Sequence, residues 1–212
     1  MALRTRPTLY CCDDYENNKH TSGYSISLSE NGVLYCMGSE AYGVTISSPL
    51  PSRIAKLENI KEISCGAKHL ICLDFSGKVF TVDNKPFGVL GVGSSRIKIP
   101  SIPQHIELPP VKQVSAGSYF NVCVTEDGFV YSFGNSDFYQ LGHGDKVSHG
   151  KPKKIESLKD VEFVECGALH TLCKCYNGDV YAWGSNSHGQ LGEVYLDDQC
   201  SPSIKRLAKR HS

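Results

Sequence analysis

The sequence has no excess of either charge, because Lys plus Arg and Asp plus Glu both number 22 in 212 residues. A neutral chain has no overall field that attracts a phosphate backbone, so we expect neither nucleic acid nor chromatin as a partner. No run approaches the roughly 18 consecutive apolar residues of a membrane span, and residues 1–7 lack the apolar core of a secretory signal. We therefore expect a cytoplasmic protein without a membrane partner. The basic run 205–210 is a candidate nuclear signal.

The chain also lacks the motifs of common enzymatic sites. No glycine-rich stretch ends in Lys followed by Ser or Thr, as a phosphate-binding loop would. No Ser, His and Asp set and no carboxylate pair stands out, so we predict no catalytic residue, no cofactor and no enzymatic activity. No convincing amphipathic helix and no low-complexity stretch is present either.

What the sequence does contain is an internal repeat. Residues 66–91, 117–142 and 167–192 align without a gap over 26 residues, and their starts are 51 and 50 residues apart. A weaker copy covers residues 24–43. A fixed period of this length is typical of solenoids and propellers.

Each copy centres on a dipeptide that favours a tight turn between two apolar-rich runs. Such dipeptides suit a two-residue type I′ loop, which needs positive φ at both positions. We predict four β-hairpins, which turn at Asn31-Gly32, Ser76-Gly77, Asp127-Gly128 and Asn177-Gly178.

A two-residue loop would fix which side chains face each other across the hairpin. In the second unit Cys72 would face Thr81, and Ile71 would face Val82. The equivalent small pairs would be Ser27–Cys36, Cys123–Ser132 and Cys173–Ala182. One face of every hairpin would then be small and the other bulky, and stacked units would bury both faces, as propeller blades do.

Two further strands are expected in each unit. Apolar runs of the form V-x-x-V or I-x-x-I lie just before the hairpins, at residues 60–63, 111–114 and 161–164. Farther upstream, prolines each lie three residues before an isoleucine, which suits an edge strand because no ladder hydrogen bond is lost there. These prolines are Pro51, Pro103 and Pro152.

The combined pattern resembles the repeat of the regulator of chromosome condensation family. The phrases are Cys-Gly-x-x-His, Asp/Asn-Gly-x-Val-Tyr-x-Trp/Phe-Gly and Gly-Gln-Leu-Gly, and residues 166–170, 177–184 and 189–192 match best. The resemblance covers roughly residues 20–207. It implies β-propeller blades, seven in a complete propeller of this family. We predict an all-β chain of about four such blades in an open or incomplete propeller.

This pattern divides the chain into an N-terminal extension (1–20), one repeat domain (21–207) and a basic tail (208–212). The four units lie near residues 21–64, 65–116, 117–166 and 167–207. Two explanations remain open for the small number of units: a truncated or spliced form of a seven-bladed protein, or a part that stacks on another chain.

An arc of four blades leaves one face of each terminal blade uncovered. We expect the uncovered end of the fourth unit around Tyr181, Trp183 and Ile204, so that the chain hides these faces by self-association or by binding a partner.

Ten cysteines raise the question of disulfides or zinc. A column of thiols at one repeat position indicates packing, because free Cys behaves as a small apolar residue. The main column is Cys72, Cys123 and Cys173, and a second contains Cys65 and Cys166. The run of His170, Cys173 and Cys175 lacks the paired C-x-x-C of zinc sites. We predict buried, reduced, metal-free thiols. His69 and His170 share a position with Phe120, which favours packing or hydrogen bonding over catalysis.

The loops that follow the hairpins differ most between the units. Aromatic or imidazole side chains hold one position in them: Tyr42, Phe87, Phe138 and His188, with Tyr139 next to Phe138. Exposed on one rim, these five residues would form a partner-contact surface. The alternative is that they pack beneath their own loops.

We therefore predict a non-catalytic β-propeller module for protein–protein interaction, as a regulatory or scaffold subunit. The resemblance implies an alternative, guanine-nucleotide exchange on a Ran-like small GTPase. The founding member of the family inserts an extra hairpin into its GTPase. The linkers here are of nearly equal length, 25 and 24 residues, so no insertion stands out that would supply such a hairpin.

A third alternative is part of a ubiquitin ligase or kinase. The expected partners are a protein, such as a small GTPase, or further blades. The light-sensing members use clustered tryptophans, and Trp183 stands alone, which excludes that role.

Overall fold

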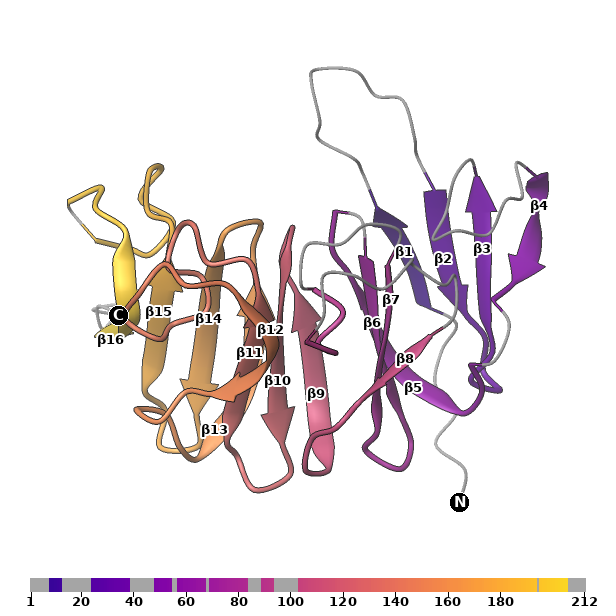
Figure 1. Ribbon diagram of the computed structural model, residues 1–212, viewed down its shortest axis with the longest axis horizontal. Coiled ribbons are helices and arrows are strands. Elements are labelled where there is room, and N and C mark those ends of the chain that lie inside the picture. The colour runs from indigo at the N-terminus through magenta and orange to yellow at the C-terminus, as the bar shows by residue number, and fades with distance from the viewer. Residues whose placement is uncertain are drawn as a thin grey trace, which may run out of the picture.

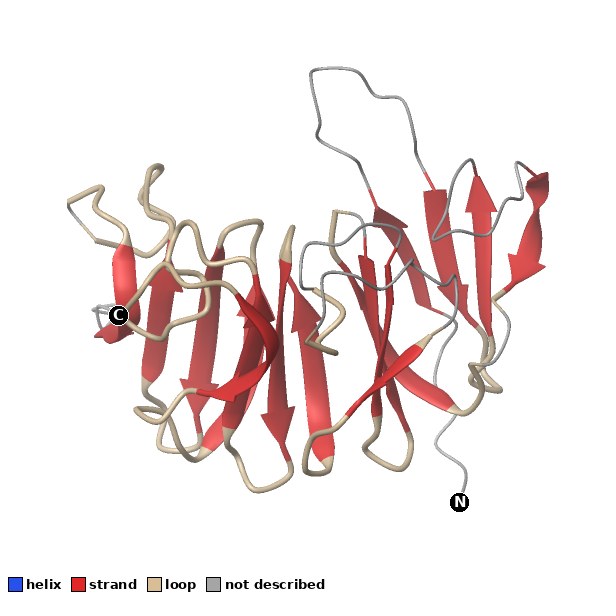
Figure 2. Ribbon diagram, in the orientation of Figure 1, coloured by secondary structure: helices blue, strands red, loops and turns tan. Residues whose placement is uncertain are grey.

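The computed structural model describes residues 8–12, 24–38, 48–54, 57–67, 69–83, 89–93, 103–193 and 195–205. These residues form strands and loops, as Figure 2 shows. Within them there is no helix that is long and apolar enough to cross a membrane.

The strands form four antiparallel sheets, each a meander of four consecutive strands. We call these sheets blades 1 to 4. Blade 1 contains β1 (Thr8–Cys12), β2 (Tyr24–Leu28), β3 (Leu34–Gly38) and β4 (Ser48–Arg53). Blade 2 contains β5 (Ile60–Cys65), β6 (His69–Asp74), β7 (Val79–Asp83) and β8 (Gln104–Ile106). Blade 3 contains β9 (Val111–Ala116), β10 (Phe120–Thr125), β11 (Val130–Gly134) and β12 (His149–Lys154). Blade 4 contains β13 (Val161–Cys166), β14 (His170–Cys175), β15 (Val180–Gly184) and β16 (Gln199–Lys205).

The blades stand side by side in chain order, with blade 1 at one end and blade 4 at the other (Figure 1). The first strands β5, β9 and β13 of successive blades contact one another. Among the described residues no strand pairing joins blade 4 to blade 1. The prediction of an all-β, open set of four blades is confirmed.

The four hairpins turn where the sequence predicts, but the type of turn is different. In blade 2, Asp74 N donates to Lys78 O (2.9 Å) and Gly77 N donates to Asp74 O (3.1 Å), which encloses a three-residue loop. Only the glycine of each predicted dipeptide has a positive φ, between 71° and 90° in the four turns. This is a type I turn followed by a glycine bulge. The predicted two-residue type I′ loop is therefore wrong.

The longer loop shifts every predicted cross-strand pair by one residue. Cys72 pairs with Phe80 and Ile71 with Thr81. The other blades shift in the same way, as in Cys123–Tyr131, Cys173–Tyr181 and Ser27–Tyr35. The small–small and bulky–bulky pairs are thus wrong, and each face mixes small with large side chains.

Apolar side chains fill the spaces between successive blades. One cluster joins blades 1 and 2 around Ile26 and Leu70, and a second joins blades 2 and 3 around Ile71 and Phe133. The third joins blades 3 and 4 around Trp183. Both faces of blades 2 and 3 are therefore buried, as expected for propeller blades.

The uncovered face of blade 4 differs from the prediction. Trp183 is fully buried against blade 3, and Tyr181 packs in the same cluster. Because strand side chains alternate, the uncovered face carries Phe163, Leu172, Lys174 and Val180 instead. The error follows directly from the shifted register.

The remaining strand predictions hold. The runs at 60–63, 111–114 and 161–164 are the first strands of blades 2 to 4. The prolines occur in or directly before edge strands: Pro51 in β4, Pro152 in β12 and Pro103 just before β8. The sheets of blades 2 to 4 therefore begin with a V-x-x-V or I-x-x-I strand rather than at the hairpin, and the first sheet begins with residues 8–12.

Cys72, Cys123 and Cys173 are buried and are not joined in disulfides. Burial raises the pKa of the Cys173 thiol to about 12 and raises the pKa of the other two thiols as well. The prediction of buried packing thiols is confirmed for these three. Among the described cysteines, Cys200 is the exposed one.

Candidate interaction surface

Two long loops correspond in blades 3 and 4: residues 135–148 between β11 and β12, and residues 185–198 between β15 and β16. The glutamine of the Gln-Leu-Gly phrase supports each one from inside. Gln140 Oε1 accepts a hydrogen bond from Phe138 N (2.8 Å), and Gln190 Oε1 accepts one from His188 N (2.9 Å). The same backbone shape therefore presents Phe138 in one blade and His188 in the next.

Buried polar side chains tie the two halves of each loop together. Ser136 Oγ donates to Asp145 O (3.2 Å), and at the equivalent position Asn186 Nδ2 donates to Tyr195 O (2.6 Å). Both residues are fully buried. Side chains on these loops are thus held on a preformed framework, which lowers the entropy lost on binding a partner.

The predicted contact residues differ in their surroundings. Phe138 is 41% exposed and His188 is exposed. Tyr139 is half-buried and has the Lys146 ammonium over its ring, 4.8 Å from the centroid. Tyr42 and Phe87 lie outside the described residues. The role of these five residues in binding stays a prediction.

Three further apolar residues on the same loops were missed by the sequence reasoning. Val147 is 57% exposed, Tyr195 78% and Leu196 60%. All three follow the Leu-Gly phrase of their loops, where the sequence carries no signal that a side chain points outward. We call Phe138, Val147, His188, Tyr195 and Leu196 the loop surface.

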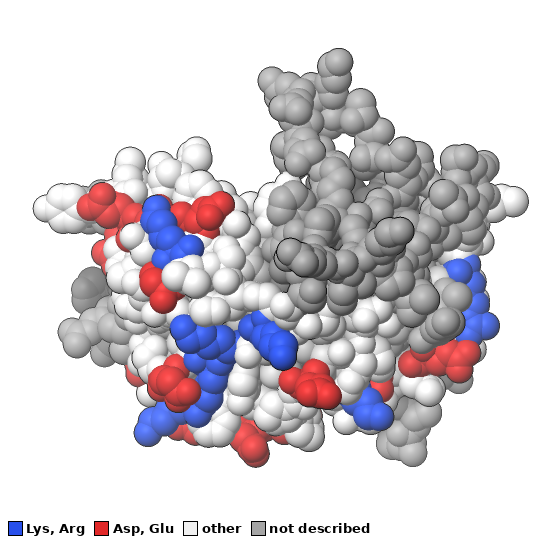
Figure 3. Space-filling model, in the orientation of Figure 1, with Lys and Arg blue, Asp and Glu red and all other residues white. Residues whose placement is uncertain are grey.

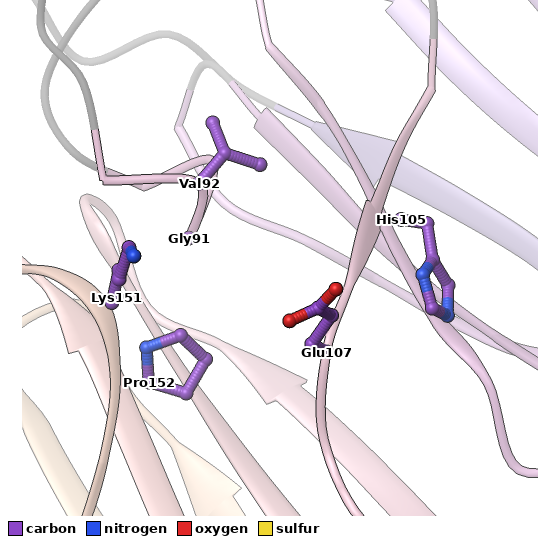
Figure 4. A pocket seen from close by; sticks show the side chains of 6 residues that line it. All are labelled: Gly91, Val92, His105, Glu107, Lys151 and Pro152. Carbon is purple, nitrogen blue, oxygen red and sulfur yellow. The ribbon is translucent and has the colours of Figure 1, made fainter.

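A second candidate is a cavity of about 380 Å³ where blades 2 and 3 meet. Figure 4 shows its lining, with Lys151 and Pro152 from β12 and with Gly91, Val92, His105 and Glu107 from blade 2. The side chains of Glu107 and His105 lie on opposite sides of their ribbon in this view. Its polar groups therefore do not converge on one point, as those of a small-molecule site would.

One serine and one histidine approach each other in blade 3. Ser132 Oγ lies 3.0 Å from His143 Nε2 and donates its proton to Leu141 O (2.7 Å). Desolvation, together with Lys153 and His149, lowers the pKa of His143 to about 4. Because Ser132 is fully buried and its hydroxyl proton is already bonded to a carbonyl, this pair is not arranged as a nucleophile and base.

The run from His170 to Cys175 does not converge on a metal. His170 lies on the uncovered face of β14, whereas Cys173 and Cys175 lie on the face toward blade 3. No group of three His, Cys, Asp or Glu side chains in the described part of the chain could hold a metal ion. On the face shown in Figure 3, basic and acidic side chains lie interspersed rather than gathered by sign.

Comparison with known proteins identifies the repeat. A sequence profile described as Regulator of chromosome condensation (RCC1) repeat matches residues 127–173 and 177–209. A second profile with the same description matches residues 111–140 and 161–190. The matches cover blades 3 and 4, where the repeat is most regular.

Relatives and solved structures agree with these profiles. The human E3 ubiquitin-protein ligase HERC2 is 35% identical over 155 residues, which are 68% of this chain and 3% of HERC2. The ultraviolet-B receptor UVR8 of Arabidopsis thaliana is 31% identical over 213 residues, 94% of this chain and 48% of UVR8. The structure of Prp20p from Saccharomyces cerevisiae superposes with a TM-score of 0.76 and 21% identity, over 87% of this chain and 49% of Prp20p.

This chain thus spans about half the length of UVR8 and of Prp20p, and a small part of HERC2. The family is indicated by the hairpin repeat, by the four-stranded blades and by the relatives. The chain belongs to the regulator of chromosome condensation (RCC1) repeat family.

Proposed function

We propose that the chain is a non-catalytic protein-interaction module that binds a protein partner through its loop surface. The observation that carries the proposal is the shared framework of the two loops. A glutamine at the same repeat position supports each loop, Gln140 in blade 3 and Gln190 in blade 4, yet the exposed side chains presented there differ: Phe138 against His188. A fixed framework with variable exposed side chains suits recognition of a partner.

The chemistry of the loop surface favours a protein partner. Phe138, Tyr195 and Leu196 supply large apolar groups, and aromatic residues dominate the binding energy of many interfaces. The surface lies at the loop end of the blades, and Figure 1 shows the loop between β15 and β16 projecting beyond the strands. We propose a cytoplasmic or nuclear site of action, as the sequence leads us to expect.

Photo-crosslinking in cells that express the full chain tests this proposal. A benzophenone amino acid would replace Phe138 in one variant, His188 in a second and Glu126 in a control, since Glu126 is exposed on a hairpin turn at the other end of blade 3. We expect one common protein to crosslink at positions 138 and 188 but not at 126. Equal capture at all three positions, or none at 138 and 188, would contradict the proposal.

The alternative of guanine-nucleotide exchange has its own readout. Prp20p, which shares the fold, binds Gsp1p and histones. If this chain were an exchange factor, it would accelerate the release of a fluorescent GDP analogue from a Ran-type GTPase. Our proposal expects the release rate to be unchanged by the chain, with EDTA as the positive control for release.

A further inference from the structure

Blades 2 and 3 each offer the following blade the same set of polar contacts. On the first strand of each, a serine hydroxyl accepts a backbone hydrogen bond from the next blade. Ser64 Oγ accepts from Ala116 N (2.9 Å), and Ser115 Oγ accepts from Cys166 N (3.0 Å). This contact repeats because the two serines occupy the same position in their blades.

A lysine on the same strand makes the second repeated contact. Lys61 Nζ donates to Lys112 O (3.3 Å), and Lys112 Nζ donates to Val161 O (2.7 Å). In both cases the ammonium reaches the backbone of the next blade's first strand, where it satisfies a carbonyl.

The third contact comes from the residue beside each lysine. Glu62 Oε1 accepts from Val114 N (3.4 Å). Gln113 makes two bonds with Val164: its Oε1 accepts from Val164 N (2.9 Å), and its Nε2 donates to Val164 O (2.9 Å).

The fourth contact comes from the loop that follows the hairpin. Gly93 N donates to Gly150 O (2.8 Å), and Gly144 N donates to Cys200 O (2.8 Å), in each case on the outer strand of the next blade. Both glycines have φ near +85° (84° and 86°), which side chains rarely permit.

An apolar residue completes each of these junction faces. Leu73 in blade 2 and Val124 in blade 3 occupy the same position, and neither is exposed at all. The face that each blade turns to its successor is therefore apolar at its centre.

Blade 4 replaces the residue at all five positions. In blade 4, Glu162 replaces the lysine and Phe163 replaces the residue at the position of Glu62 and Gln113. Glu165 replaces the serine, and Lys174 replaces the apolar residue. In sequence, Val194 takes the place of the glycine. We call Glu162, Phe163, Glu165, Leu172, Lys174 and Val180 the outer face of blade 4.

The replacements form a surface suited to water. Lys174 Nζ lies 2.6 Å from Glu162 Oε2 and 5.6 Å from the centroid of the Phe163 ring. The side chains of Lys174 and Glu162 are 39% and 38% exposed, and Glu165 is exposed. The lysine covers part of the aromatic ring and keeps its charge in solvent.

The opposite face of blade 4 keeps every contact with blade 3. Val164 N and Cys166 N donate to Gln113 and Ser115 of blade 3, and Trp183 is fully buried between the two blades. Blade 4 is therefore regular on one side and altered on the other, which general degradation of the repeat would not produce.

We propose that the outer face of blade 4 is a capping surface, which ends the stack because no further blade of this type can cover it. Burying Lys174 where Leu73 or Val124 belongs, and Glu165 where a serine belongs, would strip two charges of water without the matching groups. Terminal repeats with a polar outer face serve this purpose in other repeat proteins.

The capping surface would prevent a second copy of this chain from docking on blade 4. The face of blade 1 that points away from blade 2 carries Ser25, Ser27, Tyr35 and Met37, which are half-buried. These residues match the receiving faces of the other blades, where Tyr35 corresponds to Tyr181. Without a cap, blade 4 of one copy could dock on blade 1 of the next, and such head-to-tail contacts generate open filaments.

Restoring the junction residues tests the cap. The variant Glu162→Lys, Phe163→Gln, Glu165→Ser, Lys174→Val gives blade 4 the residues of blade 3 at four positions. We expect it to self-associate at least about ten-fold more tightly than the wild-type chain in sedimentation velocity. The matched control, Glu126→Ser with Lys159→Val, also removes a carboxylate and an ammonium from exposed sites, and should sediment as the wild type does.

A second variant keeps the test decisive. Leu172→Glu places a further charge on the outer face and should leave the association state of the wild-type chain unchanged. If it reduces association, the outer face is already an interface and the proposal is wrong. The restored variant should also keep a β-sheet circular dichroism spectrum like that of the wild type. If it does so and still sediments as the wild type does, the four restored positions are not what prevents association through this face, and the proposal is equally wrong.

Discussion

The junction between blades 2 and 3 and the junction between blades 3 and 4 share one backbone plan but use different side chains. In the first, His69 Nε2 lies 2.9 Å from Asn121 Oδ1, and Asn121 Nδ2 donates to Val89 O (2.9 Å). Asn121 of blade 3 thus joins His69 of blade 2 to the loop of blade 2 that contains Val89. All three residues are buried.

In the second junction, Phe120 replaces the histidine and Thr171 replaces the asparagine. The loop carbonyl equivalent to that of Val89 belongs to Gln140. Trp183 Nε1 donates to it (2.9 Å), and Thr171 Oγ1 donates to it over a longer distance (3.4 Å). Blade 3 has Phe133 at the position of Trp183, and its ring offers no donor.

The difference shows what a junction of this kind requires. A buried carbonyl needs a donor, because leaving it without one costs free energy. Either an amide or an indole can supply that donor, and the neighbouring positions change together to fit. The three positions therefore behave as one unit.

The largest effect is expected at Trp183. The substitution Trp183→Ala removes a fully buried ring and the donor to Gln140 O, and should lower the free energy of unfolding by about 3–5 kcal/mol. Trp183→Phe keeps most of the ring and leaves Gln140 O with the longer bond from Thr171 alone, so it should cost about 1 kcal/mol. Urea denaturation measures both. Equal losses for the two variants would show that the hydrogen bond, not the packing, carries the junction.

His69→Phe should destabilise the chain by about 1–3 kcal/mol, because it removes the partner of Asn121 Oδ1 in a buried site. The triple variant His69→Phe, Asn121→Thr, Phe133→Trp copies the second junction into the first and should recover most of that loss. Denaturation of the single and triple variants decides the point. A triple variant less stable than the single one would refute the view that the positions form a unit.

The same histidine should make the first junction sensitive to acid. Burial lowers the pKa of His69 to about 4 from an ordinary value of 6.5, so the unfolded chain binds more protons between these two values. The stability that depends on neutral His69 is therefore complete above pH 6.5 and falls as the pH drops to about 4. The triple variant lacks this residue and should lose less stability over that range.

A smaller effect is expected at Glu62, the counterpart of Gln113. Burial raises its pKa from 4.5 to about 7, so the folded chain binds the extra proton between these values, and its stability falls as the pH rises through that range. Glu62→Gln should add about 1 kcal/mol of stability at pH 8 and nothing near pH 4, where the glutamate is neutral in both states. Thermal melts at the two pH values measure the gain. The reverse variant Gln113→Glu should lose stability at pH 8, and a gain there would contradict the account.

The smallest effect concerns the thiols as reporters of each junction. Cys123 lies in the first junction and Cys173 in the second, and both are buried. Because blade 4 has a neighbour on one side only, the second junction should open more often. We expect a thiol reagent to label Cys173 a few times faster than Cys123 in the native chain, as read by mass spectrometry of peptides. Faster labelling of Cys123 would reverse the order of stability proposed for the two junctions.

The fold could be predicted from the sequence because the repeat supplies independent copies of each signal. The position of every hairpin followed from its turn dipeptide. The register did not, because Asn-Gly and Asp-Gly also suit the three-residue loop found here. In three of the four units a signal for the longer loop was present in the residue three positions before the glycine: Ser29, Asp74 and Thr125. Asp74 Oδ1 accepts from Ser76 N (2.8 Å) and Lys78 N (2.9 Å), and Thr125 Oγ1 accepts from Phe129 N (3.0 Å).

The candidate surface was predicted only in part. Phe138 and His188 were found because they hold one position in loops that share the Gln-Leu-Gly phrase. Tyr195 and Leu196 were missed, since nothing in a single sequence shows whether a loop residue points outward. The outer face of blade 4 could not be recognised either, because the register error assigned Trp183 to the wrong side of the sheet.

The junction hydrogen bonds also set the sequence separation between the residues that join one blade to the next. Those between first strands join residues 49 to 52 positions apart, as in Lys112–Val161, Lys61–Lys112 and Ser64–Ala116. A closed ring needs its last blade before its first can settle, but no strand pairing of that kind exists among the described residues here. The contacts between neighbouring blades would allow each blade to dock during synthesis as soon as the next roughly 50 residues leave the ribosome. Each inner apolar face would then stay uncovered only for the time that one blade takes to be made.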